Sequence, residues 1–394
     1  MFVMDATIRQ QIEDHEIRAI ALDTEAFDAK QLTLEVGLLR RVAQFANSDI
    51  AVLLPDVIAG EVEAHLLQST SDAQGQFKRA MRLVEQTQLL SLVDDGKPLT
   101  QQLVETILDP GAAKEISHNR LKKWIECTGA VVLHASDHVG LNEVMLRYFH
   151  VQAPFATTGP KKHEFPDAIA LLTLEHWAEQ NKCKILVVSN DADWIRYCES
   201  SQRLVLVRDL ADALSGFQSE AASYAARRLA ELLDEGDPVG LEAALLEALK
   251  SQEDKVEFHV EASSQFEFEH DVAEPTFTEI ELPDLESAIR DFEAVDYDEA
   301  TVSVQITATV LAEVRNYFDF RKWDGIDREY MSMGSGKIVT EERIDIEAIV
   351  TLGGQIPERM KIEEIEILPQ THGIDLYDIE PDWMSDPGNY DMNE

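Results

Sequence analysis

The sequence predicts two domains of different class. The first is an α/β domain with a central parallel sheet and a helical insertion, and the second is an acidic, β-rich α+β domain. The 394 residues exceed the usual size of one domain. In the first half, short apolar runs alternate with helical patterns, which is typical of an α/β sandwich. In the second half, apolar and polar residues alternate with period two, which is typical of a half-exposed antiparallel sheet.

The first domain is predicted over residues 1–215. Its first half contains short buried strands at 18–23 and 49–56, a helical pattern at 29–48 and a helix that opens at Pro55-Asp56. Residues 76–150 have the pattern of several helices and are predicted to be an insertion. The alternation then resumes with a helix at 166–180, a strand at 183–191, a helix at 191–200, a strand at 203–210 and a helix at 211–217.

The second half is divided into three predicted segments. Residues 216–252 are rich in alanine and leucine and are predicted to be a helical connector or packing pair. Residues 253–380 form the β-rich domain, with strands expected at 256–260, 266–270, 276–280, 301–314, 343–352 and 361–368. Residues 381–394 are predicted to be an extended acidic tail. The aromatic segment 317–337 lies between two of these strands, and its rings either stack on bases or, as the surrounding acidity favours, belong to the core.

Charge is distributed unevenly between the halves. Up to Ser215 the chain has 31 acidic and 21 basic residues, a balance of −10, and the rest has 44 acidic and 13 basic residues, a balance of −31. A broad nucleic-acid surface is usually basic, so the second half is not expected to provide one. A metal-dependent nuclease in the first half stays compatible with this balance, because such a site uses carboxylates and only local lysines.

Other classes of protein receive no support from the sequence. No apolar run approaches the roughly 20 residues of a membrane helix, and the N-terminus lacks a signal pattern, so a soluble, cytoplasmic protein is expected. The three cysteines form no CxxC pair, which argues against a disulfide framework or a zinc site. All three are expected to be small buried side chains.

Four acidic residues follow or face predicted strand ends, where open parallel sheets collect functional groups. Asp23 ends the first strand, Asp191 with Asp193 ends the strand at 183–191, Asp167 follows a proline at a helix start, and Glu61 lies about one turn into its helix. Clustered carboxylates repel one another unless counter-charges are present. Oxygen ligands without histidine or cysteine suit Mg²⁺ or Mn²⁺, which serve phosphodiester hydrolysis.

Each of these residues also has an ordinary structural interpretation. Asp23 can cap the next helix, Asp167 is favourably placed near a helix dipole, and Asp191 can form an Asx turn. Glu63 competes with Glu61 for the position facing the site. Their joint occurrence at strand ends of one α/β unit favours a functional site over four separate structural roles.

The order of motifs resembles the PIN-domain nucleases over residues 16–215. The motifs are "ALDTEAF", "PDVIAGEVEAHL", "KKHEFPDAIALLTLEHWA" and "LVVSNDADW", and the third is similar to a bacterial PIN-like branch. The resemblance implies an Mg²⁺- or Mn²⁺-dependent endonuclease, typically a ribonuclease. It assigns Asp23, Glu61, Asp167 and Asp191 as catalytic and metal-binding residues, with Asp193 as an accessory metal ligand.

Within this interpretation, Lys161 and Lys162 are candidate contacts for substrate phosphates, against the alternative of a solvated loop. The expected function is hydrolysis of RNA by the first domain, with the acidic second domain in regulation or in binding a protein partner. The alternatives are a DNA or flap-type nuclease and a non-catalytic binding protein whose acidic domain carries the function. No membrane association is expected, and an oligomer stays open.

Overall fold

The structure is a computed structural model that describes residues 6–89, 104–109, 111–155, 164–218, 220–270, 274–298, 300–324, 329–357 and 359–385. It separates into two compact units, Met1–Gln218 and Ser219–Glu394. Each unit is described by itself below. None of the helices in the described ranges is long and apolar enough to cross a membrane.

The N-terminal unit is built on a parallel sheet of five strands within the described residues, in the order β3-β2-β1-β4-β5. The strands are β1 Ile17–Leu22, β2 Ala51–Pro55, β3 Val131–Leu133, β4 Lys184–Val188 and β5 Leu204–Val207. The run from Ala19 to Leu22 is buried, as expected for a strand covered on both faces. Four of these strands, β1, β2, β4 and β5, lie at the predicted positions. The three-residue strand β3, by contrast, lies inside the segment that was predicted to be helical.

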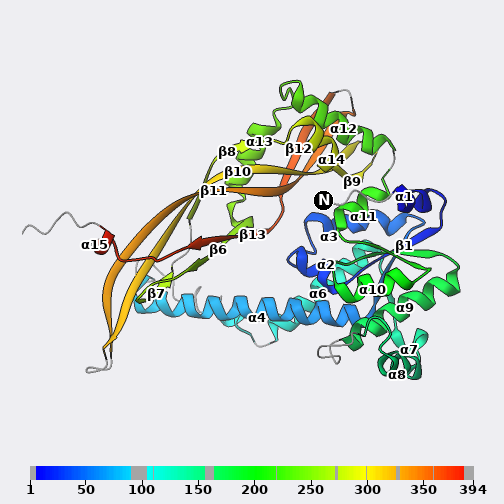
Figure 1. The fold of residues 1–394 in the computed structure, drawn as a ribbon, viewed down its shortest axis with the longest axis horizontal. Helices are drawn as coiled ribbons and strands as arrows, with labels where there is room; N and C mark the ends of the chain where they lie inside the picture. Colours follow the sequence, from blue (N-terminus) through cyan, green and yellow to red (C-terminus); the bar gives the residue numbers. More distant parts are fainter. Residues whose placement is uncertain are drawn as a thin grey trace, which may run out of the picture. The chain divides into compact units, whose positions relative to one another are not determined.

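Helices surround this sheet (Figure 1). They are α1 Ala6–Glu13, α2 Thr24–Ala29, α3 Gly37–Arg41, the 3₁₀ helix η1 Val42–Asn47, α4 Asp56–Gln86, α6 Ala112–Thr128, α7 Ala135–His138, α8 Leu141–His150, α9 Phe165–Asn181, α10 Ala192–Ser200 and α11 Leu210–Gly216. The single helix predicted over 29–48 is wrong. A turn with positive φ at Gln31, Leu32 and Gly37 separates α2 from α3, and such angles do not continue a right-handed helix.

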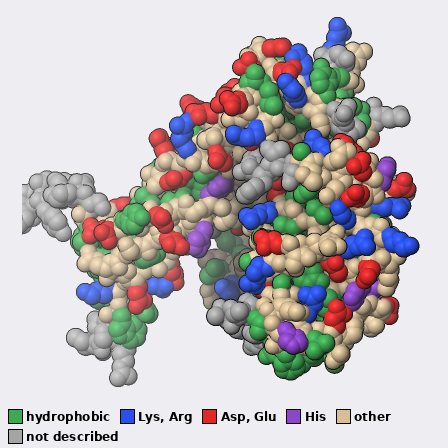
Figure 2. Space-filling view, turned by 45° about the vertical axis from the view of Figure 1, so that its right-hand side comes forward, with side chains coloured by type: hydrophobic (Ala, Val, Ile, Leu, Met, Phe, Trp, Pro, Cys, Tyr) green, Lys and Arg blue, Asp and Glu red, His purple; other side chains and the backbone are tan. Residues whose placement is uncertain are grey.

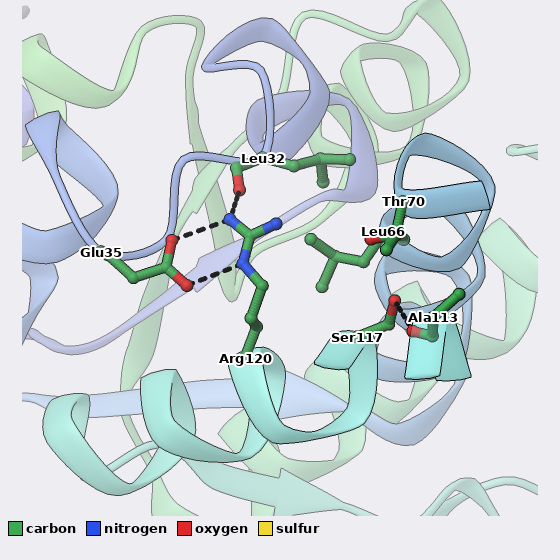
Figure 3. Close-up of polar contacts among 7 residues, drawn as sticks. All are labelled: Leu32, Glu35, Leu66, Thr70, Ala113, Ser117 and Arg120. Atoms are coloured by element: carbon green, nitrogen blue, oxygen red, sulfur yellow. Dashed lines mark hydrogen bonds and ion pairs between the residues drawn. The ribbon is translucent and has the colours of Figure 1, made fainter. Parts of the chain in front are cut away.

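Arg120 on α6 fastens the turn between α2 and α3. Its Nε and Nη2 donate to the two carboxylate oxygens of Glu35 at 2.7 Å each, and Nη2 also donates to the carbonyl of Leu32 at 2.8 Å (Figure 3). A two-pronged contact of this kind fixes geometry as well as charge. The hydroxyls of Thr70 on α4 and of Ser117 on α6 donate to carbonyls four residues earlier, so these polar groups are satisfied within their own helices.

The C-terminal unit is organised around one long antiparallel hairpin. Its strands β10 Thr301–Asp324 and β11 Glu329–Gln355 pair along their whole length. The described parts of the aromatic segment 317–337, which was predicted to lie between two strands, therefore belong to the hairpin strands themselves. Phe318 and Phe320 are buried there in a small core, in agreement with the core interpretation, whereas Trp323 and Tyr330 are exposed.

The remaining strands border this hairpin or pair separately. They are β6 Val256–Ala262, β7 Glu267–His270, β8 Glu274–Glu281, β9 Glu293–Tyr297, β12 Arg359–Ile367 and β13 Gln370–Leu376. β7, β8 and β9 pair antiparallel with β10, and β12 pairs antiparallel with β11. β6 and β13 pair parallel to each other, so the expectation of a wholly antiparallel arrangement is wrong for these two strands.

Helices in this unit contribute to its core. They are α12 Glu220–Asp234, α13 Leu241–Ser251, the 3₁₀ helix η4 Glu253–Lys255, α14 Leu285–Asp291 and α15 Asp382–Ser385. Leu229 of α12 and Leu245 of α13 are fully buried in one cluster with β-strand residues such as Val304. The segment predicted as 216–252 therefore packs on the β-rich part rather than standing apart from it.

The start of the predicted acidic tail also packs on the hairpin. The indole Nε1 of Trp383 donates to the carbonyl of Met333 at 2.7 Å. Gly336 lies so close to this segment that a Cβ there would be 2.9 Å from the carbonyl oxygen of Glu380. The last residues of the predicted tail, 386–394, lie outside the described residues.

Two surface properties bear on the predictions. Cys183 and Cys198 are buried as expected, but Cys127 is exposed, because it lies on the solvent side of α6 beside Glu126.

Acidic and basic side chains are intermixed over the face drawn in Figure 2. The net charge of the chain is thus spread among many side chains on this face instead of forming one acidic patch.

Candidate active site

The candidate site lies at the point where the order of the parallel strands reverses. The chain runs from β1 outward to β2 and β3, and then returns to the other side of β1 to form β4 and β5. Parallel sheets bind ligands beyond the carboxyl ends of their strands at such a switch point. β1 and β4 are direct neighbours with Leu22 opposite Val188, so the residues that follow them, Asp23 and Ser189, meet at this edge.

Asp23 is almost completely buried, at 4% exposure. Its Oδ1 accepts from the backbone N–H of Thr24 at 2.6 Å, and its Oδ2 accepts from the Ser189 hydroxyl at 2.8 Å. Burial raises the pKa of Asp23 to about 7; the hydrogen bond from Ser189 acts against this rise, and the charges of Asp167 and Asp191 add to it. Asp23 also caps α2, so the structural alternative for this residue is present together with an unusual electrostatic environment.

Asp191 begins α10 and is connected to Asp23 through one side chain. The Ser189 hydroxyl that donates to Asp23 accepts from the backbone N–H of Asp191 at 3.0 Å. The Asp191 carboxylate accepts from the N–H groups of Asp193 and Trp194 at 2.6 and 3.3 Å, which makes it the N-cap of α10. Ser189 therefore fixes the relative positions of the two aspartates.

Asp193 lies two residues further along, in the first turn of α10, and faces a cation. Its carboxylate forms an ion pair with Arg196, whose guanidinium also donates to the carbonyl of Pro154 at 3.0 Å. Burial raises the pKa of Asp193, the Arg196 charge lowers it, and the charges of Asp191 and Glu164 raise it again. Asp193 is thus coupled to the other carboxylates but already has a counter-charge.

Asp167 is positioned by an indole. It lies in the first turn of α9, after a proline that suits that turn, and its Oδ1 accepts from Nε1 of the fully buried Trp194 at 2.8 Å. Burial raises the pKa of Asp167 to about 6; the Trp194 hydrogen bond lowers it, and the charges of Asp191, Glu61 and Asp193 raise it.

Glu61 and Glu63 face different neighbours. Glu61 Oε2 accepts from the Thr24 hydroxyl at 2.7 Å, so it is joined to the residue next to Asp23, and its charge acts on Asp167. Glu63 instead lies 3.2 Å from Nδ1 of His118 on α6. Of the two glutamates, Glu61 is the one on the side of the carboxylate group.

The carboxylates are coupled electrostatically but are not assembled into a cage. Among the described residues, no group of three or more His, Cys, Asp or Glu side chains is arranged to hold a metal ion. Burial is the main cause of the raised pKa values of Asp23 and Asp167, and the charges of neighbouring carboxylates add to it over distances longer than those of ligation. The raised pKa values therefore do not require a preformed cage. The oxygen donors fit a hydrated Mg²⁺ or Mn²⁺, since Mg²⁺ usually binds through one or two carboxylates plus substrate phosphate and keeps several waters.

Two predicted residues cannot be placed. Lys161 and Lys162 lie outside the described residues, as does His163 between them and the helix. Three residues that the sequence did not single out do contact the site, namely Thr24, Ser189 and Trp194. Ser189 had one available signal, because it precedes Asp191 by two residues directly after a buried strand.

The N-terminal unit is therefore an α/β domain in which acidic residues lie together at the carboxyl edge of a parallel sheet. A family model described as PIN domain matches residues 20–194, a range that includes all five acidic residues considered above. This part of the chain is therefore a PIN domain, a nuclease-type fold, as the motifs predicted. No curated protein matches the chain, and no solved structure does.

Proposed function

We propose that the N-terminal unit is an endonuclease that hydrolyses phosphodiester bonds in RNA with the help of Mg²⁺ or Mn²⁺. Support comes from the PIN-domain match and from the geometry at the switch point. RNA is favoured over DNA by the resemblance to PIN proteins, which are typically ribonucleases.

The observation that carries this proposal is the burial of two neighbouring carboxyl groups, Asp23 and Asp167, which raises their pKa values to about 7 and about 6. Burial without a counter-charge disfavours ionised carboxylates. A divalent cation would reverse this effect by favouring the ionised forms. Ionising these buried carboxyl groups is costly in the free protein, and a bound cation lowers that cost. This coupling between ionisation and cation binding suits a metal-dependent reaction on a polyanion.

The protein groups have separate roles in this proposal. Asp23, Glu61, Asp167 and Asp191 would hold the ion directly or through its waters, with Asp193 as an accessory ligand. A bound Mg²⁺ or Mn²⁺ supplies positive charge to the phosphate and lowers the pKa of a bound water. Ser189, Thr24 and Trp194 act through the carboxylates by fixing their orientation, as outer partners of metal ligands commonly do.

Lys161 and Lys162 are proposed to contact substrate phosphates. They precede Phe165, where α9 begins, by only a few residues, so they belong to the segment that leads into Asp167. The C-terminal unit is proposed to regulate this activity or to bind a protein partner, because its predicted balance of −31 opposes direct binding of a polyanion.

The proposal is tested with purified full-length protein and end-labelled single-stranded RNA and DNA, each with Mg²⁺, with Mn²⁺ or with EDTA. Internal cleavage of RNA that requires the metal and is lost in Asp23→Asn is the expected result. Preferential cleavage of DNA would support a DNA nuclease instead. Absence of cleavage of either nucleic acid under all conditions would refute the enzymatic proposal and leave a binding protein.

A further inference from the structure

Helix α4 carries a continuous row of polar side chains that starts at the candidate active site. Residues three or four positions apart lie on the same face of a helix. From Glu61, this spacing gives His65, Gln68, Asp72, Gln76 and Arg79. The row therefore connects a carboxylate of the site with a cation more than four turns away along the helix labelled in Figure 1.

The middle of this row borders a hollow in the surface. A cavity of about 480 Å³ is lined by His65, Gln68, Ser69, Asp72, Ala73 and Gln76. His65 Nδ1 lies 3.0 Å from the Asp28 carboxylate on α2, and Gln68 donates to Asp72 at 3.0 Å. Five of the six lining side chains carry a hydrogen-bonding group, and Ala73 is the exception. A polar ligand can therefore form hydrogen bonds with this hollow.

The far end of the helix carries three cations, Lys78, Arg79 and Arg82, all of them exposed. Within the described ranges, none of the three forms an ion pair or a side-chain hydrogen bond. Glu85 is the only acidic residue among 73–86. In a chain with 75 acidic and 34 basic residues, three neighbouring cations that form no ion pair with any described residue make a local surface that attracts anions.

This part of α4 contributes little to the core. Its buried residues are Ile58, Val62 and Leu66, all in the first third of the helix. The later turns contribute no buried side chain among the described residues. Packing therefore does not account for the basic and polar composition of these turns.

We propose that the α4 face, defined as His65, Gln68, Ser69, Asp72, Gln76 and Arg79 with the flanking Lys78 and Arg82, binds single-stranded RNA that extends from the active site. This inference rests on the proposed function for its choice of ligand. From Glu61 to Arg79 the helix rises about 27 Å. At about 3.4 Å per stacked nucleotide, an RNA strand would span this distance with about eight nucleotides.

The test is RNA binding by the full chain in EDTA, so that no cleavage occurs. Fluorescence anisotropy is measured with labelled RNAs of 4 and 16 nucleotides over a series of salt concentrations. The test variant replaces Lys78, Arg79 and Arg82 with Gln. A control variant makes the same charge change at Arg40, Lys122 and Lys123, which are exposed on α3 and α6 of the same unit.

For single strands, the slope of log affinity against log salt is about −0.7 per neutralised phosphate. The triple variant should therefore lose about 2 from the slope measured with the 16-nucleotide RNA. The control should keep the wild-type slope, and binding of the 4-nucleotide RNA should be the same in all three proteins. Thermal melts of the three proteins check that they are equally folded.

An unchanged slope in the triple variant, an equal loss in the control, or equal wild-type affinity for the two RNAs would overturn the inference. These outcomes are separate from those of the cleavage test. RNA that is bound through the α4 face but never cut would retain the inference and refute the nuclease. RNA that is cut with no contribution from Lys78, Arg79 and Arg82 would do the reverse.

Discussion

Replacing Asp23 with Asn should make the metal-free protein more stable at alkaline pH. The Asp23 carboxyl has an ordinary pKa of 3.8, and burial raises it to about 7 in the folded protein. Between these two values the folded state binds more protons than the unfolded state, so stability falls as pH rises through this window. Asn has no proton to lose and is similar in size, so it should not show this loss.

The magnitude follows from the shift. Each pKa unit corresponds to about 1.36 kcal/mol, so ionisation of buried Asp23 costs the folded state about 4 kcal/mol over the whole window. Between pH 5 and pH 8, about two of the roughly three units are crossed, which gives about 2.5 kcal/mol. The stability of wild type relative to Asp23→Asn should therefore fall by about this amount from pH 5 to pH 8 in EDTA.

The assay must report on the N-terminal unit alone, because a chain with two units need not unfold in one step. Hydrogen exchange of the β1 and β4 amides, measured by mass spectrometry in EDTA, provides such a probe. Asp49→Asn is the matched control, since Asp49 is exposed. The reasoning is refuted if Asp23→Asn has the same pH dependence as wild type, or if Asp49→Asn reproduces its effect.

Three further predictions concern the site and the second unit. Glu61→Gln should lower the cleavage rate by about 10–100-fold, whereas Glu63→Gln should leave it unchanged. The reason is that, of the two glutamates, Glu61 is the one that faces the carboxylates. Equal losses of rate in a cleavage assay would contradict this assignment. Trp194→Phe removes the hydrogen bond to Asp167, which for a charged acceptor is worth about 1.5–3 kcal/mol. The cleavage rate should therefore fall at least tenfold, and the pKa of Asp167 in the pH profile of the rate should rise above about 6. An unaltered pH profile would argue against a positioning role for Trp194. Ending the chain after Gln218 should raise the cleavage rate at low salt. It should have no effect near 1 M salt, because charges are then screened beyond about 3 Å. A lower rate at all salt concentrations would indicate a recruiting or stabilising role for the second unit.

The sequence predicted the parts of the fold that depend on local pattern. Buried parallel strands are short apolar runs, so β1, β2 and β4 and their acidic ends could be located, and the switch-point rule brought Asp23 and Asp191 together. β3 was missed because three residues are too few to show a period. The break between α2 and α3 was missed because the positive φ values at Gln31 and Leu32 have no glycine to announce them.

Contacts between distant segments could not be predicted in the same way. Trp194 is an apolar residue in an amphipathic helix, and nothing in its neighbours indicates that its indole reaches Asp167, 27 positions earlier. The leucines of α12 and α13 show that these helices bury one face, but the pattern does not identify the sheet that covers it. The hairpin strands extend past their alternating segments because Phe318 and Phe320 find a second small core there.

The cap of α2 and the proposed functional carboxylate are the same residue, Asp23. Both descriptions apply in part, since Asp23 accepts the Thr24 N–H at the start of α2. Asn and Ser cap helices about as well as Asp does, and neither would carry the cost of ionisation in a buried position. A carboxylate that is 4% exposed with a pKa of about 7 is therefore a poor choice for capping alone. A carboxylate at this position is explained if its ionised form is needed when a cation and a substrate phosphate are present, which is the condition in the proposed metal-dependent nuclease.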